Sequence, residues 1–112
     1  MRTLRNSVQL IGNLGMDPEV KEASNGNKMA RFSLATSDTY HKANGEKVTD
    51  TQWHNLIIWG KLADVAEKYL KKGKQIAVEG KLETNTYDDK EGKRKFYTQI
   101  NVNDLMMLGK EN

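Results

Sequence analysis

The stretch Thr51–Leu62 reads TQWHNLIIWGKL and carries both tryptophans of the chain, Trp53 and Trp59. Side chains alternate between the two faces of a β-strand, so the even spacing places both indoles on one face, roughly 20 Å apart. The opposite face then carries a set with the character of a core side: His54, Leu56 and Ile58. Two large rings on the outer face are unusual, because that face of an antiparallel strand is normally polar. The stretch alone is equally compatible with a strand buried on both faces, or with a tryptophan packed under a loop.

Length and composition indicate one globular domain with a modest core, since the chain has 112 residues, 37% of them hydrophobic and 29% charged. No apolar run approaches the ~20 residues that span a bilayer, and the first ten residues lack a signal-peptide pattern. We therefore expect a cytoplasmic protein without membrane contact. The net charge of +3 is too mild to indicate a polyanionic ligand by itself. The absence of cysteine excludes disulfides and thiolate metal sites.

Alternating apolar residues predict four further strands around the opening stretch. They cover residues 8–14, 30–36, 75–82 with an outward continuation to Tyr87, and 96–102. Glycines 12 and 15 lie where a strand bends sharply or another backbone comes close. The pairs Asn25-Gly26 and Asn44-Gly45 are turn signals, and a polar turn contains Gly92.

One segment changes to a helical period after Gly60. Leu62, Val65, Ala66 and Tyr69 follow the spacing of an amphipathic helix, which Gly73 is placed to end. Five strands with one short helix after the third predict an all-β, five-stranded OB-fold barrel with long β-hairpin arms. A five-stranded SH3-like barrel remains the alternative. Apolar-face positions assign three rings and one leucine to the core: Phe32, Tyr69, Phe96 and Leu82.

Catalytic chemistry is difficult to build from these residues, so we do not expect an enzyme. His41 and His54 are the only histidines, no cysteine is present, and no glycine-rich phosphate loop occurs. His54 lies on the core-facing side of its predicted strand, which favours a structural or interface role. Asp88 and Asp89 lie in a lysine-rich turn, and solvation of their carboxylates is a simpler explanation than a metal site. We expect no metal and no cofactor.

Four aromatic residues lie on outward parity or on the expected hairpin arms: Tyr40, Trp53, Trp59 and Tyr87. Six lysines are interleaved with them: Lys42, Lys47, Lys61, Lys72, Lys74 and Lys81. Aromatic side chains stack on bases regardless of sequence, and ammonium groups neutralise phosphates. A duplex hides its base faces, so this pattern favours single strands. Ordinary surface or interface rings are the alternative explanation.

Long sequence blocks resemble bacterial single-stranded DNA-binding proteins almost from end to end. They are NxVxLIGNLGxDPE at 6–19, FSLATS at 32–37, WHNLIIWGKLADVAEKYLKKG at 53–73 and VEGKL at 78–82. The resemblance implies an OB-fold that assembles into a homotetramer, a dimer of dimers, and coats single-stranded DNA without sequence preference. It further implies a nucleoid-associated role in DNA replication, recombination and repair.

The resemblance also assigns roles to positions. The family's base-stacking aromatics fall on Tyr40, Trp53, Trp59 and Tyr87, and its interface residues on Asn6 and His54. We expect phosphate contacts from nine cationic side chains: Arg2, Arg31, Lys42, Lys47, Lys61, Lys72, Lys74, Lys81 and Arg94. Glu83 and Asn85 depart from the family, which often has arginines between the fourth-strand core and Tyr87.

The domain is expected to cover residues 1–108, with 109–112 as a short C-terminal end. Family members usually continue into a flexible tail whose acidic tip recruits replication and repair proteins. This chain ends at Asn112 without such a tip, so tail-mediated recruitment is not assigned to it.

Three rival functions remain open at this stage. An RNA-binding OB module would use similar chemistry, and a protein-interaction domain would bury the same aromatic face in an interface. An OB-fold nuclease is the most distant rival, because a convincing acid–base cluster is missing.

Overall fold

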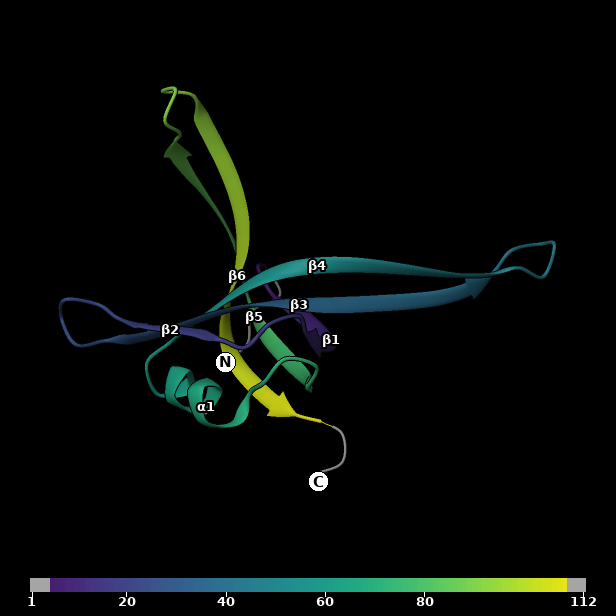
Figure 1. The fold of residues 1–112 in the computed structure, drawn as a ribbon, viewed down its shortest axis with the longest axis horizontal. Coiled ribbons are helices and arrows are strands. Elements are labelled where there is room, and N and C mark those ends of the chain that lie inside the picture. Colours follow the sequence, from purple (N-terminus) through teal and green to yellow (C-terminus); the bar gives the residue numbers. More distant parts are fainter. Residues whose placement is uncertain (1–4, 109–112) are drawn as a thin grey trace.

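The chain folds into a small closed β-barrel from which two long hairpins project (Figure 1). The computed structural model describes residues 5–108. Its elements are β1 (Val8–Leu14), β2 (Glu19–Glu22), β3 (Lys28–His41), β4 (Lys47–Trp59), α1 (Lys61–Tyr69), β5 (Gln75–Asp88) and β6 (Arg94–Met107). Within the described residues, no helix is long and apolar enough to cross a membrane.

The barrel contains the five strands that the sequence predicts. They are ordered β1-β5-β6-β4-β3, and pairing of β1 with β3 closes the ring. Only β4 and β6 run parallel, with Leu56 opposite Ile100. The helix lies between the third and fourth barrel strands, so the expected all-β OB-fold barrel is confirmed. The short β2 pairs with β3 outside the ring, and the sequence analysis did not predict it.

Two glycines allow the barrel strands to approach closely. A Cβ atom at Gly12 would collide with the carbonyl oxygen of Ala35, and one at Gly80 with that of Asn101. The expected close backbone approach at Gly12 is therefore confirmed. Glycine is needed at both positions because any side chain would push neighbouring strands apart.

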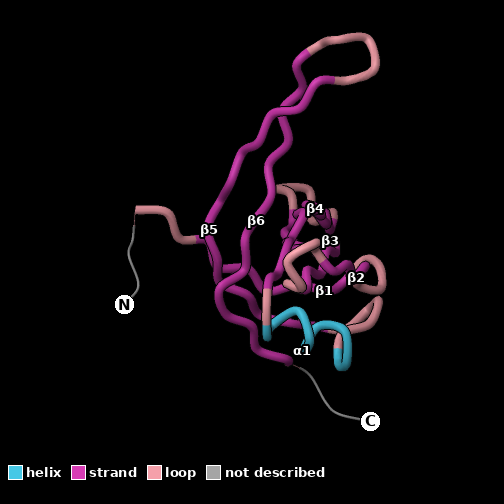
Figure 2. The backbone as a smooth tube through the Cα atoms, turned by 90° about the vertical axis from the view of Figure 1, so that its left-hand side faces the viewer, coloured by secondary structure: helices cyan, strands magenta, loops and turns pink. Residues whose placement is uncertain are grey.

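The helix covers one end of the barrel (Figures 1 and 2) and packs on β2, β3 and β4. Its buried stripe contains Ala63, Ala66 and, just past its end, Leu70. Gly60 at the start and Gly73 after the end have φ values of 74° and 90°, which side-chain-bearing residues rarely adopt. Tyr69 is 56% exposed, so its assignment to the core was wrong. It lies on the flank of the stripe in the last helical turn, where no strand covers it.

Two further core assignments were wrong, because they lie on a hairpin beyond the barrel. Leu82 is 47% exposed and Phe96 is 68% exposed, whereas Phe32 is buried as expected. Leu82 and Phe96 lie on the same side of their strands as the buried core residues. Among residues 5–108, no second layer of structure covers that face of the projecting hairpin (Figure 2).

The two projecting hairpins are defined here as the β3–β4 arm, residues 37–51, and the β5–β6 arm, residues 82–98. None of their residues is fully buried. They leave the barrel in different directions and extend the molecule to 55 × 43 × 30 Å (Figure 1). Both arms were expected from the positions of the turn signals.

Candidate nucleic-acid interface

The two tryptophans share the outer face of the β3–β4 sheet, as the sequence predicts. Trp53 pairs with Ala35 and Trp59 with Met29, and Arg31 lies between them on the same face. The indoles are 63% and 44% exposed, respectively. Ile57, on this same face between them, is only 6% exposed. The strand is therefore buried on both faces only near its C-terminal end, at residues 56–58, and is exposed at the two indole positions.

The ring of Trp53 lies against the backbone of Gly15. A Cβ atom at Gly15 would collide with the six-membered part of the indole. The Gly15 amide donates a hydrogen bond to the Ser33 carbonyl at 3.0 Å, which holds this backbone beside β3. The sequence predicted a close approach at Gly15, and the structure identifies the approaching group as a side chain. One side of the indole is thus supported while the residue remains mostly exposed.

A neutral hydroxyl ladder continues outward from Trp53 along the same face of the β3–β4 arm. The hydroxyls of Ser37 and Thr51 lie 3.2 Å apart, and those of Thr39 and Thr49 lie 3.3 Å apart. The face ends at the pair of His41 and Lys47 near the tip. From the barrel to the tip, this face of the arm therefore presents first an aromatic ring, then neutral hydrogen-bonding groups, and finally a cation.

Tyr40 lies on the other face of this arm, so the structure does not align it with Trp53. The register pairs Tyr40 with Val48, and the preceding pair on that face is Asp38 opposite Asp50. Tyr40 is exposed, as predicted. Its immediate surroundings are acidic, however, which is unfavourable for a phosphate backbone.

The β5–β6 arm presents Tyr87 beside a second ring that the sequence analysis missed. The centroids of Tyr87 and Tyr97 lie 5.8 Å apart, with the ring planes inclined by 56°. Lys95 is directly opposite Tyr87 on the same face. In the predicted strand, Phe96 was placed on the inward-facing side, so its neighbour Tyr97 belongs to the outward-facing side. This alternation is the sequence signal that could have identified Tyr97.

Glu83, which departs from the family pattern, has two hydrogen-bonding partners in the structure. Gln99 and Asn101 donate side-chain hydrogen bonds to the Glu83 carboxylate at 3.2 Å each. This carboxylate is therefore occupied within the hairpin, on the same face as Lys81 and Tyr87. Arg94 pairs with Asp88 on the opposite face of the arm, away from Tyr87.

Two of the predicted phosphate-binding side chains, Arg31 and Lys42, have acidic neighbours. Arg31 has Glu19 as its cross-strand neighbour on β2. The ammonium of Lys42 lies 4.0 Å from the carboxylate of Glu46 in the turn of the β3–β4 arm. Arg2 lies outside the described residues, as does the short end at 109–112.

Three of the predicted lysines follow Trp59 in the chain or lie in a loop that is bonded to the segment beside Gly15. Lys61 begins α1 two residues after Trp59. The loop containing Lys72 and Lys74 is fastened to the end of β1: the Lys72 amide donates to the Asp17 carboxylate at 2.9 Å, and the Lys74 carbonyl accepts from the Leu14 amide at 3.0 Å. This fastening places the loop next to the backbone of Gly15 on which Trp53 rests.

The two predicted interface residues make hydrogen bonds inside the chain. The Asn6 side chain donates to the Leu82 carbonyl at 3.0 Å and accepts from the Leu82 amide at 2.9 Å. It thereby imitates a further strand residue ahead of β1. The Nε2 atom of His54 lies 3.0 Å from the Thr36 hydroxyl in a half-buried position.

An ion-pair cluster at the other end of β4 was not predicted. The ammonium of Lys28 lies 2.8 Å from Asp64 and 3.0 Å from Glu67 on α1. Hydrogen bonds to these carboxylates raise the pKa of Lys28 above its ordinary value, and the bond from Lys28 lowers the pKa of Asp64. The Lys28 carbonyl accepts from the Gly60 amide at 2.9 Å. The cluster therefore joins β3, α1 and the residue that follows Trp59.

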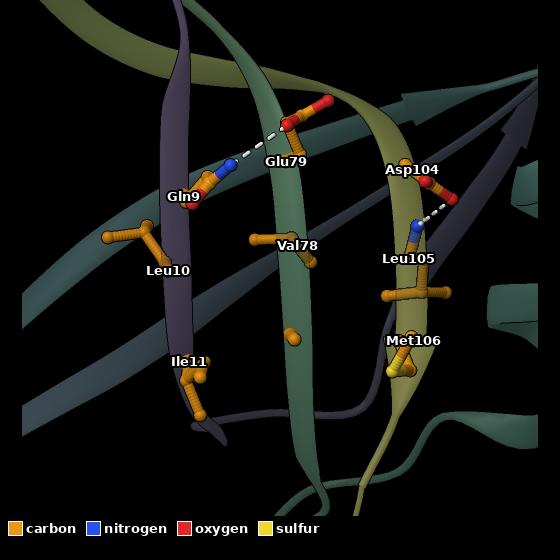
Figure 3. A pocket seen from close by; sticks show the side chains of 9 residues that line it. Gln9, Leu10, Ile11, Val78, Glu79, Asp104, Leu105 and Met106 are labelled. Carbon is orange, nitrogen blue, oxygen red and sulfur yellow. Dashed lines mark hydrogen bonds between the residues drawn. The ribbon is translucent and has the colours of Figure 1, made fainter.

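A hollow of about 470 Å³ lies elsewhere, on the outer face of β1, β5 and β6 (Figure 3). Ile11 and Met106 contribute exposed apolar side chains to it. At its polar end, Gln9 donates to Glu79 at 3.1 Å. Of the predicted base-stacking and phosphate-binding residues that the structure describes, none lines this hollow. Among residues 5–108, no group of three histidines or acids is arranged to hold a metal ion.

Comparisons with known proteins agree with this geometry. A model of the single-strand binding protein family matches residues 5–108. Single-stranded DNA-binding protein 1 of Chlorobaculum tepidum is 46% identical over 105 residues, which are 93% of this chain and 65% of that protein. The single-stranded DNA-binding protein of Neisseria meningitidis serogroup A is 43% identical over 107 residues, which are 96% of this chain and 62% of the relative.

The chain thus spans slightly less than two thirds of the length of these curated relatives. A solved structure of the Plasmodium falciparum SSB complex with ssDNA superimposes with a TM-score of 0.87 at 31% identity. The superposition covers 97% of this chain and 99% of that one.

Proposed function

The chain belongs to the single-strand binding protein family, and on that premise we propose that it binds single-stranded DNA without sequence specificity. Its role is to coat and protect exposed strands during DNA replication, recombination and repair. It acts by binding and not by catalysis, and it uses no cofactor. The mechanism combines base stacking with neutralisation of phosphates.

One observation carries this proposal: two exposed indoles of β4 share the outer face of the β3–β4 sheet, with Arg31 of β3 between them. Each indole offers a π-surface on which any base can stack, with about 1–3 kcal/mol per base. The hydroxyl ladder from Trp53 to Lys47 provides neutral partners for the sugar-phosphate chain beyond the first ring. The bound DNA strand therefore follows the face of the β3–β4 arm that carries Trp53.

Tyr87 provides a third stacking position on the β5–β6 arm, and the lysines beside the tryptophans contribute phosphate contacts. We retain Tyr40 as a stacking position on the opposite face of the β3–β4 arm. Its acidic neighbours make its contribution the weakest of the four. A strand that reaches Tyr40 must cross from one face of the arm to the other.

Tryptophan fluorescence during titration with oligo(dT) tests the proposal, with duplex DNA of matched length as the control. Trp53→Phe and Trp59→Phe each leave one indole, so the emission of each position is measured separately. We expect quenching of both by oligo(dT) and little by duplex. Raising the salt concentration should weaken binding with a log–log slope of about −0.7 per neutralised phosphate.

Two other outcomes would redirect the assignment. Tighter binding of oligo(rU) than of oligo(dT) would favour the RNA-binding rival. If no polynucleotide changes the emission while the protein remains folded, base stacking is wrong and the aromatic face serves a protein interface.

We also propose that the protein is a homotetramer, a dimer of dimers, with Asn6 and His54 near the subunit contacts. Support comes from the face of β1, β5 and β6, where Ile11 and Met106 expose apolar surface of the kind found at interfaces. The occupant we propose for this face is a second copy of the chain. Sedimentation velocity should give the tetramer mass, and Ile11→Glu should shift it to smaller species. A monomer at micromolar concentration would refute this assembly.

The proposed ligand also sets the cellular context. We propose a cytoplasmic, nucleoid-associated location, which imaging of a fluorescent fusion would test through its overlap with stained DNA. Diffuse fluorescence excluded from the nucleoid would contradict it. We propose no docking segment for replication and repair proteins within residues 5–108.

A further inference from the structure

Tyr97 contacts the predicted stacking ring Tyr87 on the β5–β6 arm. The register pairs Tyr87 with Lys95 and Asn85 with Tyr97, so the two rings are diagonal neighbours on one face of the ribbon. Their centroids are 5.8 Å apart and their planes are inclined by 56°. Both rings are exposed.

This geometry does not form a slot for a base. A base between two rings needs parallel planes roughly 7 Å apart, twice the carbon–carbon contact distance. The observed pair is closer and strongly tilted, which is the arrangement of aromatic rings that pack on each other. Tyr97 therefore occupies one side of Tyr87 and leaves its remaining surface for a ligand.

Tyr87 has little other support. The arm is a two-stranded ribbon without a fully buried residue, and the opposite face carries the exposed pair of Thr86 and Phe96. Trp53, by contrast, rests on the backbone of Gly15 at the barrel. A ring without such backing loses more rotamer freedom when it stacks on a base.

We propose that Tyr97 is a positioning residue for Tyr87: it holds the Tyr87 ring in the orientation that stacks on a base. The inference rests on the proposed binding of single-stranded DNA and adds a residue that acts through another ring. Removing Tyr97 should weaken oligo(dT) binding about threefold to tenfold, the range expected for one aromatic pair. Tyr97→Phe keeps the ring and should retain most of the affinity.

A double-mutant cycle on fluorescein-labelled oligo(dT) tests the proposal by anisotropy. The variants are Tyr87→Ala, Tyr97→Ala, their combination and Tyr97→Phe. Phe96→Ala is the matched control, since it removes a ring of similar size from the opposite face of the arm. Thermal unfolding of each variant verifies that the barrel remains folded.

We expect Tyr97→Ala to weaken binding in the wild-type background and to have no further effect once Tyr87 is alanine. Phe96→Ala should bind like the wild type. Equal losses in both backgrounds would overturn the proposal, because Tyr97 would then contact DNA by itself. Wild-type affinity of Tyr97→Ala would overturn it as well. Failure of the wild-type protein to bind oligo(dT) would instead refute the proposed function, and this inference with it.

Discussion

The barrel half and the arm half of the β5–β6 hairpin follow the same alternation and have opposite burial. In the barrel half, Ile76 and Val78 of β5 and Ile100 of β6 are buried. In the arm half, Leu82 and Phe96 continue the same parity and are exposed. The same two strands form both halves, and their register shifts once, between Glu79 and Gly80. The difference in burial arises because a second layer covers the face only in the barrel half.

Alternation therefore reports which side chains share a face, while burial depends on what packs against that face. The difference also bears on function. A ribbon that nothing covers exposes both of its faces to solvent, whereas the barrel exposes only its outer face. In the barrel, Trp53 is supported by backbone; on the arm, Tyr87 is supported by another ring.

The sharpest test of this contrast removes an apolar side chain of similar size from each half. Ile76→Ala in the barrel should lower the free energy of unfolding by about 2–5 kcal/mol, because it leaves a cavity in a packed core. Leu82→Ala on the arm should change it by less than about 0.5 kcal/mol, since no packed cavity is created. Urea denaturation followed by circular dichroism measures both. Similar losses for the two variants would show that the arm is packed in solution.

The support of Trp53 by the barrel can be broken at Gly15. Gly15→Ala places a methyl group where the indole lies, so the ring must move and its emission maximum should shift. We expect oligo(dT) affinity to fall by about 1 kcal/mol, part of the stacking contribution of one base. In a Trp53→Ala background the same substitution should have no further effect on affinity. An equal loss in that background would show that Gly15 acts elsewhere.

The tolerance of the arm for charge is testable at the cross-strand pair of Asp38 and Asp50. Like charges directly opposite each other destabilise a ribbon, so Asp38→Asn should stabilise the β3–β4 arm by about 0.2–1 kcal/mol. Binding to oligo(dT) at low salt should become tighter, because a negative charge beside Tyr40 is removed. Hydrogen exchange of the arm amides and anisotropy titrations measure the two effects. Asp104→Asn on β6, which removes the same charge at the distant hollow, is the comparison; an equal gain in affinity there would argue against a local electrostatic effect beside Tyr40.

The smallest effect is expected at the exposed ion-pair cluster of Lys28, Asp64 and Glu67. The pKa of Asp64 is lowered in the folded protein, so its contribution is present above the ordinary carboxyl pKa and is lost as the pH falls. The pKa of Lys28 is raised, so its contribution is present below its ordinary pKa of 10.5 and is lost at higher pH.

Lys28→Met should therefore lower the melting temperature slightly at neutral pH, and the difference from wild type should shrink in acid and at high salt. Melting curves between acidic and neutral pH provide the measurement. A difference that stays constant with pH would mean that the lysine acts through packing of its aliphatic chain.

Local patterns in the sequence were sufficient for the barrel strands, the helix and the outward tryptophans. The alternation around Trp53 and Trp59 depends only on neighbouring residues, as do the turns at Gly45 and Gly92. The contact between Trp53 and Gly15 could not be predicted from local sequence patterns, because folding brings together two segments that are distant in the chain. The Lys28 cluster has the same character, since its members lie on β3 and α1.

Other errors came from applying a local rule where its condition fails. Phe96 was placed in the core because parity was taken to imply burial. Tyr97 was not considered, although it faces outward in its predicted strand, as Tyr87 does in the neighbouring one. The prediction of base stacking at both Tyr40 and Trp53 stands, and the register adds that they lie on opposite faces of the β3–β4 sheet.

The closure of the barrel through β1 has a consequence for the order of folding. The β3–β4 and β5–β6 hairpins each pair neighbouring segments, so their formation closes short loops. By contrast, β1 pairs with both β3 and β5, and Asn6 ahead of it bonds Leu82 across 76 positions of chain. Closing a long loop is slower because more chain entropy is lost before any contact forms. We therefore expect the hairpins to form early, with docking of β1 completing the native state.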